Sequence, residues 1–197
     1  MLRGGQHDDE RTSWTAGVPA GEDAGGPRMT PVLILGVDPG LNRCGWGVIA
    51  NEGARLSYVA HGVIEPAPAQ QLASRLHDVF EGLCAVMGEY CPHEAAVEET
   101  FVNSNARAAL ALGQARGVAL AAAARAGIAV AEYAPATIKK AVVGAGHADK
   151  TQIAFMVRRL LPTAGEVSAD AADALGVALC HAAHRGLRRR LDPALRR

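Results

Sequence analysis

The sequence predicts an α/β protein built around one mixed sheet, and three observations support this fold class. Short apolar runs of strand length are mixed with longer segments in which apolar residues recur at helical spacing. Turn residues separate the second and third runs by only a few positions, as in an antiparallel hairpin. Hydrophobic residues make up 49% of the 197 residues and charged residues 20%, which is the composition of a folded globular chain.

Composition divides the chain into three segments. Residues 1–28 are rich in Gly, Asp and Glu and show no periodicity, so we expect a disordered leader. Residues 29–185 contain the periodic segments, and their number is enough for one domain with its own core. Residues 186–197 are rich in arginine and are expected to form a basic flexible tail, although the formal net charge of the whole chain is zero.

The first three elements are expected to be strands. Val32–Asp38 is apolar at every position before the last, which fits a strand buried on both faces. It stops at Pro39-Gly40, because proline cannot donate to a sheet ladder and Pro-Gly marks a turn. The second and third strands, 44–50 and 55–65, are expected to pair across the turn at 51–53.

The later elements alternate between helices and short buried strands. One of the helices is rich in alanine and contains Gly113 and Gly117, so we expect it to pack closely on the sheet or on a second subunit. The expected elements are a helix over 70–90, a strand over 95–99, a helix over 103–126, a strand over 128–133, and helices over 135–143, 149–161 and 168–184.

The cysteine pattern and the absence of long apolar runs limit the location of the protein. The four cysteines include no C-x-x-C pair and match no standard zinc spacing, so we expect reduced thiols. No run approaches the roughly 20 apolar residues of a membrane-spanning helix. The first residues lack the charged-then-apolar pattern of a secretion signal. We therefore expect a cytoplasmic protein.

Two carboxylates close buried strands. Asp38 ends the opening strand, and Glu98 follows the apolar run at 95–97. If these strands are parallel neighbours, both acids emerge at one edge of the sheet, where open α/β sheets bind ligands. A buried strand-end acid needs a cation, hydrogen bonds or a raised pKa. The alternative for Glu98, with Glu99 beside it, is a solvated strand end.

Two further carboxylates lie near the start of the last expected helix. Asp170 and Asp173 are three positions apart, which places them on one face of that helix. Their neighbours are small and apolar, so we expect carboxylates that are not held in salt bridges. The alternative is capping of the helix N-terminus and complementarity to its dipole, which explains Asp170 better than Asp173.

Together these acids predict a divalent metal site. Carboxylates that converge at a sheet edge repel one another unless cations lie between them, and oxygen-only ligands suit Mg²⁺ or Mn²⁺. Two such ions about 4 Å apart can activate a water and stabilise the leaving oxygen of a phosphodiester. The sequence therefore predicts a phosphodiesterase.

Five motifs, in the same order along the chain, resemble those of the RuvC-type Holliday junction resolvases. The resemblance covers about residues 32–185. The matching motifs are Leu35–Gly40, Val97–Phe101, Leu112–Gly117, Lys139–Gly144 and Ala169–Ala174.

This resemblance implies an RNase H-like nuclease domain with a mixed five-stranded sheet. It also implies a cytoplasmic homodimer that resolves four-way DNA junctions during recombination and DNA repair by paired symmetric nicks, leaving 5′-phosphate and 3′-hydroxyl ends. Two Mg²⁺ per subunit are expected, with Mn²⁺ as a substitute, and the partner is a branch-migration complex of the RuvA and RuvB type. The family's catalytic and metal-binding tetrad falls on Asp38, Glu98, Asp170 and Asp173.

The resemblance also implies a set of DNA-binding residues. Phe101 matches an aromatic that stacks on an unpaired junction base. Lys139 and Lys150 match lysines near the scissile strand, where phosphate neutralisation supplies DNA affinity. Arg107 and Arg116 are candidates for backbone phosphate, with solvent as the alternative for both.

Three rival functions remain on the sequence alone. Another RNase H-like nuclease, acting on RNA or damaged DNA, would share the acids but not Phe101 or the helix motif at 113–117. A non-catalytic junction-binding module would not need the complete acidic set. An actin-like ATPase also begins with a strand ending in Asp-x-Gly, but it needs nearly twice this length and a second phosphate-binding hairpin.

Overall fold

The computed structural model describes residues 30–99, 106–146 and 149–191, and over 186–191 it describes the backbone alone. The predicted disordered leader, Phe101 and the second half of the tail therefore lie outside the described residues. Within the described part, no helix is long and apolar enough to cross a membrane.

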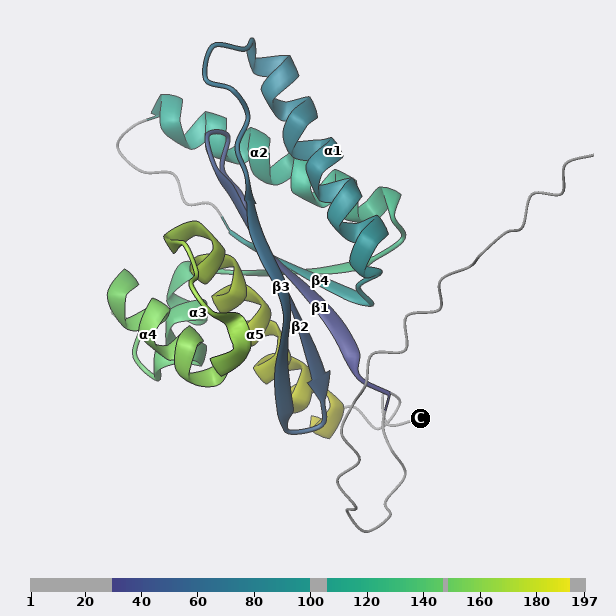
Figure 1. Ribbon diagram of the computed structural model, residues 1–197, viewed down its shortest axis with the longest axis vertical. Coiled ribbons are helices and arrows are strands. Elements are labelled where there is room, and N and C mark those ends of the chain that lie inside the picture. Colours follow the sequence, from purple (N-terminus) through teal and green to yellow (C-terminus); the bar gives the residue numbers. More distant parts are fainter. Residues whose placement is uncertain (1–29, 100–105, 147–148, 192–197) are drawn as a thin grey trace, which may run out of the picture.

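In the described residues, five strands form one mixed sheet of order β3-β2-β1-β4-β5 (Figure 1). β1 pairs antiparallel with β2 and β2 with β3, whereas β4 runs parallel to both β1 and β5. This confirms the mixed five-stranded sheet and the antiparallel hairpin. The strands are β1 Val32–Asp38, β2 Cys44–Glu52, β3 Arg55–Ile64, β4 Glu94–Glu98 and β5 Ala129–Tyr133.

Helices cover both faces of the sheet, so the molecule has three layers (Figure 1). α1 and α2 pack on the face that carries Leu35 and Val97, and α3, α4 and α5 pack on the face that carries Ile34 and Ala96. The helices are α1 Leu72–Tyr90, α2 Ala106–Arg125, α3 Pro135–Val143, α4 Lys150–Leu160 and α5 Ala169–Leu191, with a 3-10 turn at Pro162–Ala164.

Glycines let α5 lie directly on the sheet. A Cβ added to Gly36 of β1 would come within 2.1 Å of the backbone oxygen of Ala174, and one added to Gly45 of β2 within 2.1 Å of the backbone oxygen of Asp170. Real Cβ atoms do not approach backbone that closely, so any larger residue would push α5 away. The start of α5 therefore lies close against the last residues of β1 and the first residues of β2.

The predicted end of the last helix is wrong. α5 was expected to end at His184, with a flexible tail from residue 186, but it continues to Leu191. Arginine and leucine are good helix formers, and one glycine in a helix interior costs only about 1 kcal/mol, so the basic stretch extends the helix. The other described elements lie within a few residues of their predicted bounds.

Candidate active site

Asp38 and Glu98 lie side by side at one edge of the sheet. β1 and β4 are parallel neighbours, and the residues just before the two acids, Val37 and Val97, are register partners. Side chains alternate along a strand, so Asp38 and Glu98 both point to the face covered by α5. The strand-end geometry predicted from the sequence is confirmed.

α5 brings the other two acids to the same edge. A cavity of about 200 Å³ is lined by three carboxylates, Asp38, Glu98 and Asp173, together with Lys139 and Lys150. Asp170 borders the neighbouring groove instead. Its charge still acts on Asp38, whose pKa it helps to raise. The four predicted acids therefore gather in one region, with three of them in a single cavity.

Burial and repulsion between neighbouring carboxylates raise the pKa values of two of these acids. The pKa of Asp38 is raised to about 7, chiefly by burial and then by the negative charges of Glu98 and Asp173. The pKa of Glu98 is raised to about 7 for the same reasons, burial first and Asp173 second. A carboxyl with this pKa is poised to exchange a proton near neutral pH, or to give it up to a cation.

Basic side chains hold the two α5 acids in ion pairs. The Nζ of Lys150 is 2.8 Å from Oδ2 of Asp173, and the Nε of Arg43 is 2.6 Å from Oδ2 of Asp170. The expectation that these carboxylates stay out of salt bridges is therefore wrong. It rested on their neighbours in sequence, whereas the cations come from the β1–β2 loop and from the first turn of α4.

The start of α4 is fixed by its own cap, and this places Lys150. The side chain of Asp149 accepts a hydrogen bond from the backbone of Gln152, whose side chain accepts one from the Asp149 backbone. Such a reciprocal cap satisfies backbone donors at the start of a helix. Lys150, the first residue of α4, is thus held at the rim of the carboxylate cavity.

The donor set fits a hard divalent cation. Asp38, Glu98 and Asp173 offer only oxygen, and the pKa values of the first two are raised chiefly by burial and next by neighbouring acids, so a cation would favour their charged forms. Among the described residues, no three His, Cys, Asp or Glu side chains are drawn together closely enough to ligate one ion as they stand. A bound cation would have to draw these carboxylates closer together.

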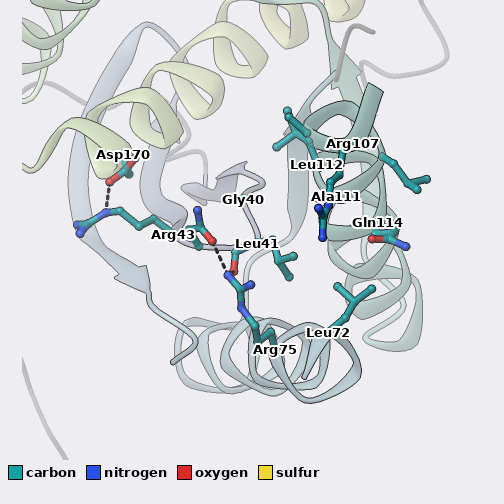
Figure 2. Close-up of a pocket in the computed structure, with 13 residues that line it drawn as sticks. Gly40, Leu41, Arg43, Leu72, Arg75, Arg107, Ala111, Leu112, Gln114 and Asp170 are labelled. Atoms are coloured by element: carbon teal, nitrogen blue, oxygen red, sulfur yellow. Dashed lines mark hydrogen bonds and ion pairs between the residues drawn. The ribbon is translucent and has the colours of Figure 1, made fainter. Parts of the chain in front are cut away.

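A larger groove of about 860 Å³ runs beside the acids, between the β1–β2 loop and the first halves of α1 and α2 (Figure 2). Figure 2 shows Arg43 crossing its rim to reach Asp170, and Arg75 pointing from α1 toward the loop. Arg75 donates to the backbone oxygen of Leu41 and to the side chain of Asn42. The groove is therefore lined by several arginines and leads to the carboxylates.

The predicted basic residues lie in three different places. Lys139 and Lys150 line the carboxylate cavity, and Arg107 is exposed and lines the groove. Arg116 is instead paired with Glu132 of β5 and is not among the residues lining either cavity.

Sequence reasoning missed Arg43 and Arg75. Arg43 also pairs with Glu65, at 2.7 Å, so it links the loop, β3's end and α5. The one available signal was the position of Arg43, five residues after Asp38 in the loop that follows the acidic strand. Arg75 carried no such signal, because it lies on an ordinary amphipathic helix.

Comparison with known proteins identifies relatives of this arrangement. Residues 34–181 match the family model described as crossover junction endodeoxyribonuclease RuvC. A protein of that name from Caulobacter sp. (strain K31) is 59% identical over 161 residues, covering 82% of this chain and 95% of the relative. One from Bradyrhizobium diazoefficiens is 60% identical over 159 residues, covering 81% of this chain and 91% of the relative.

Solved structures agree. The chain is similar to Thermus thermophilus RuvC in complex with a Holliday junction substrate, with 33% identity, a TM-score of 0.74 and coverage of 79% of this chain and 96% of that one. The yeast mitochondrial resolvase Ydc2 matches with a TM-score of 0.57 at 12% identity, a likeness of fold alone. The RNase H-like fold implied by the sequence motifs is confirmed.

Proposed function

The chain belongs to the RuvC family of crossover junction endodeoxyribonucleases, and from this premise we propose that it resolves Holliday junctions in recombination and DNA repair. The observation that carries the proposal is the convergence of Asp38, Glu98 and Asp173 in one cavity, with Asp170 at its border. A relative whose fold covers most of this chain was solved with a Holliday junction substrate. The reaction is hydrolysis of a phosphodiester, leaving 5′-phosphate and 3′-hydroxyl ends.

The four acids would hold the metal. We assign two Mg²⁺ per subunit to Asp38, Glu98, Asp170 and Asp173, with Mn²⁺ as a substitute, because the donors are all carboxylate oxygen. When bound, the ions would supply activation of the attacking water and charge compensation at the leaving oxygen. The protein itself keeps Asp38 and Glu98 buried and next to each other, so that binding of the metal ions would compensate their negative charge.

The lysines would orient the scissile phosphate. Lys139 and Lys150 border the same cavity as the acids, from α3 and α4. Lys150 pairs with Asp173, and this contact raises the pKa of the lysine, so it stays protonated at neutral pH. A cation at the cavity rim can exchange a carboxylate for a phosphate oxygen when DNA arrives.

The groove beside the cavity would carry the DNA strand toward the acids. Arg107 and Arg43 reach it from opposite sides, and apolar side chains of α2 form part of its wall. Phe101, which precedes α2 and lies outside the described residues, is proposed to stack on an unpaired base at the junction centre. Arg116 is held by Glu132, so any phosphate contact would require exchange of that partner.

A homodimer is proposed because a four-way junction needs two symmetric nicks. The outer face of α2 supports this assembly, since Leu110 is 65% exposed and lies on the same face as Gly113 and Gly117. Both glycines have open space where a side chain would stand. A second copy packed on that face would bury Leu110 and approach the glycines closely.

Three further assignments complete the proposal. The domain boundaries are a leader over 1–28 and a nuclease domain from residue 29, now extended by the longer α5. A branch-migration complex of the RuvA and RuvB type would deliver the junction. A cytoplasmic location fits the four cysteines, none of which is paired in a disulfide.

The test is cleavage of a synthetic four-way junction, a linear duplex and an RNA–DNA hybrid by purified protein, with and without Mg²⁺. Symmetric nicks in the junction alone, dependent on Mg²⁺, are expected. Asp38→Asn should remove cleavage and leave junction binding intact. Cutting of the hybrid or the duplex instead would favour another RNase H-like nuclease, and binding without cutting would favour a non-catalytic module.

A further inference from the structure

A polar chain, buried at His181 and Tyr133, links α5 to β4 and β5. Nε2 of His181 is 2.8 Å from Oε2 of Glu94, and Nδ1 of His181 is 2.9 Å from the hydroxyl of Tyr133. The Nε of Arg185 donates to the other oxygen of Glu94 at 2.7 Å. We call Tyr133, His181, Glu94 and Arg185 the distal cluster.

The partners fix the proton positions in this cluster. A carboxylate can only accept, so His181 donates to Glu94 through Nε2, and in the neutral ring Nδ1 then accepts from Tyr133. Both Tyr133 and His181 are buried, with 7% of each residue exposed. The hydrogen bonds from His181 and Arg185 hold the pKa of Glu94 down to about 2, so the carboxylate remains charged.

Glu94 and His181 of the distal cluster lie at the other end of β4 and α5 from the carboxylate cavity, and Tyr133 reaches His181 from the end of β5, where it is the register partner of Glu98. Glu94 and Glu98 are the first and last residues of β4 and face α5 on the same side of the sheet. Asp173 and His181 are eight residues apart on α5, about 12 Å of helix, and four strand residues span about 13 Å. α5 therefore runs antiparallel to β4, with His181 at Glu94 and Asp173 beside Glu98.

The hydrogen bond between His181 and Glu94 is a directional contact between α5 and β4. Packing on β1 and β2 adds to it, with Gly36 against Ala174 and Ala178 and with Leu175 over Gly47. Apolar packing is non-directional, whereas a hydrogen bond requires a narrow range of distance and angle. At the cavity end the carboxylates of α5 and the sheet repel, and the ion pairs of Asp170 and Asp173 go to exposed Arg43 and Lys150.

We propose that His181 and Glu94 are positioning residues of the nuclease: their hydrogen bond holds α5 in the register at which Asp170 and Asp173 meet Asp38 and Glu98. A shift of α5 by one residue would move both acids by about 1.5 Å along the helix axis. Groups that orient ligands from behind are needed for metal affinity even when they touch no metal. This inference rests on the proposed metal-dependent function.

The test uses the full chain and a matched pair of substitutions. His181→Leu keeps side-chain volume and removes both hydrogen bonds, whereas His181→Gln keeps a donor and an acceptor. His184→Leu is the control on the same helix: Nδ1 of His184 bonds to Cys180 of α5 itself, and its ring packs on Tyr133 with no hydrogen bond to Glu94. Leu83→Ala, in the core of the opposite face, is the control for lost stability.

Three quantities are measured for each variant: Mn²⁺ binding by calorimetry without DNA, the Mg²⁺ dependence of single-turnover junction cleavage, and junction binding in EDTA. His181→Leu is expected to weaken Mn²⁺ binding and raise the half-saturating Mg²⁺ by about tenfold, with junction binding unchanged. His181→Gln should recover most of both. His184→Leu should behave as wild type, and Leu83→Ala should lower the melting temperature without moving the Mg²⁺ dependence.

Wild-type Mn²⁺ affinity in His181→Leu, or equal loss in His181→Gln and His181→Leu, would overturn the proposal. If His181→Leu does not fold, Glu94→Gln replaces it: the partly exposed position tolerates the change, and a smaller shift in the same direction is expected. Failure of the wild-type protein to cut junctions would refute the proposed function instead. The Mn²⁺ measurements would then still decide the positioning role.

Discussion

Glu94 and Glu98 are four residues apart on one strand and point to the same side of the sheet, but their pKa values are shifted in opposite directions. The pKa of Glu98 is raised to about 7, because it is buried beside Asp173 with little compensation. The pKa of Glu94 is lowered to about 2, because His181 and Arg185 donate to both of its oxygens. The same type of side chain therefore has a charge that burial disfavours at one end of β4 and a charge held by two donors at the other.

This difference indicates which end of β4 can bind a cation or exchange a proton. At the Glu94 end the protein itself supplies a donor to each oxygen of the carboxylate, so its charge is compensated without a bound cation. At the Glu98 end, burial and the charge of Asp173 outweigh the two nearby lysines, so ionisation there costs folding energy that an added cation or proton offsets. Proteins commonly accept such a cost at functional sites and offset it elsewhere.

The largest test of this contrast compares Glu98→Gln with Glu94→Gln. Glu98→Gln should lower single-turnover junction cleavage on the order of 10³-fold, since it removes a charge that the loaded site needs. Glu94→Gln should cost less than about tenfold, because it weakens a positioning contact and keeps the shape. Both should bind junctions in EDTA as wild type does. Equal losses in the two variants would mean that the ends of β4 are not functionally distinct.

Much of the Glu98 end was predictable from the sequence, and most of the Glu94 end was not. Asp38 and Glu98 close continuous apolar runs, so their positions follow from strand assignment and from the parallel pairing of β1 and β4. The sheet and its hairpin followed from local patterns of the same kind. Asp170 and Asp173 were recognised by their spacing on one helix, but the approach of that helix over Gly36 and Gly45 had no local signal.

The distal cluster depends on contacts that no local pattern contains. His181 and Glu94 are 87 residues apart, and Arg185 and Glu94 are 91 apart. Arg185 sits at the start of a basic stretch that was read as the approach to a flexible tail. Its role appears only once α5 is known to lie antiparallel to β4. The Arg43–Asp170 pair spans 127 residues and was missed for the same reason.

A second test measures how the free energy of unfolding depends on pH, because the acids at the two ends of β4 affect it in opposite directions. Unfolded carboxyls lose their protons near pH 4, whereas folded Asp38 and Glu98 keep theirs to about pH 7. Between these values the folded state binds more protons, so the free energy of unfolding without metal should fall by a few kcal/mol from pH 4 to pH 8. Glu94, with its lowered pKa, contributes stability above pH 4 and loses it only toward pH 2.

The measurement is chemical denaturation of the metal-free protein at several pH values, repeated with Mg²⁺. Glu98→Gln should flatten the decline between pH 4 and pH 8, and Mg²⁺ should restore stability at pH 8 in the wild type. Glu94→Gln should lower stability by a similar amount throughout this range. A wild-type protein with constant stability from pH 4 to pH 8 would show that the two cavity acids are not destabilised by their surroundings.

The smallest effect is expected from deletion of residues 1–28. The described chain enters the sheet at Val32, where β1 begins, and the backbone and Nδ1 of His93 bond to the neighbouring Leu33. This is the end of the sheet where Glu94 lies, and Asp38 is at the opposite end of β1. The segment is attached at the Glu94 end of the sheet, away from the carboxylate cavity. Its removal should therefore leave junction cleavage and its Mg²⁺ dependence unchanged. Single-turnover assays of the two proteins side by side make the check. A large drop in cleavage that leaves the melting temperature unchanged would mean that the leader reaches the DNA or the cavity from the far end of the sheet.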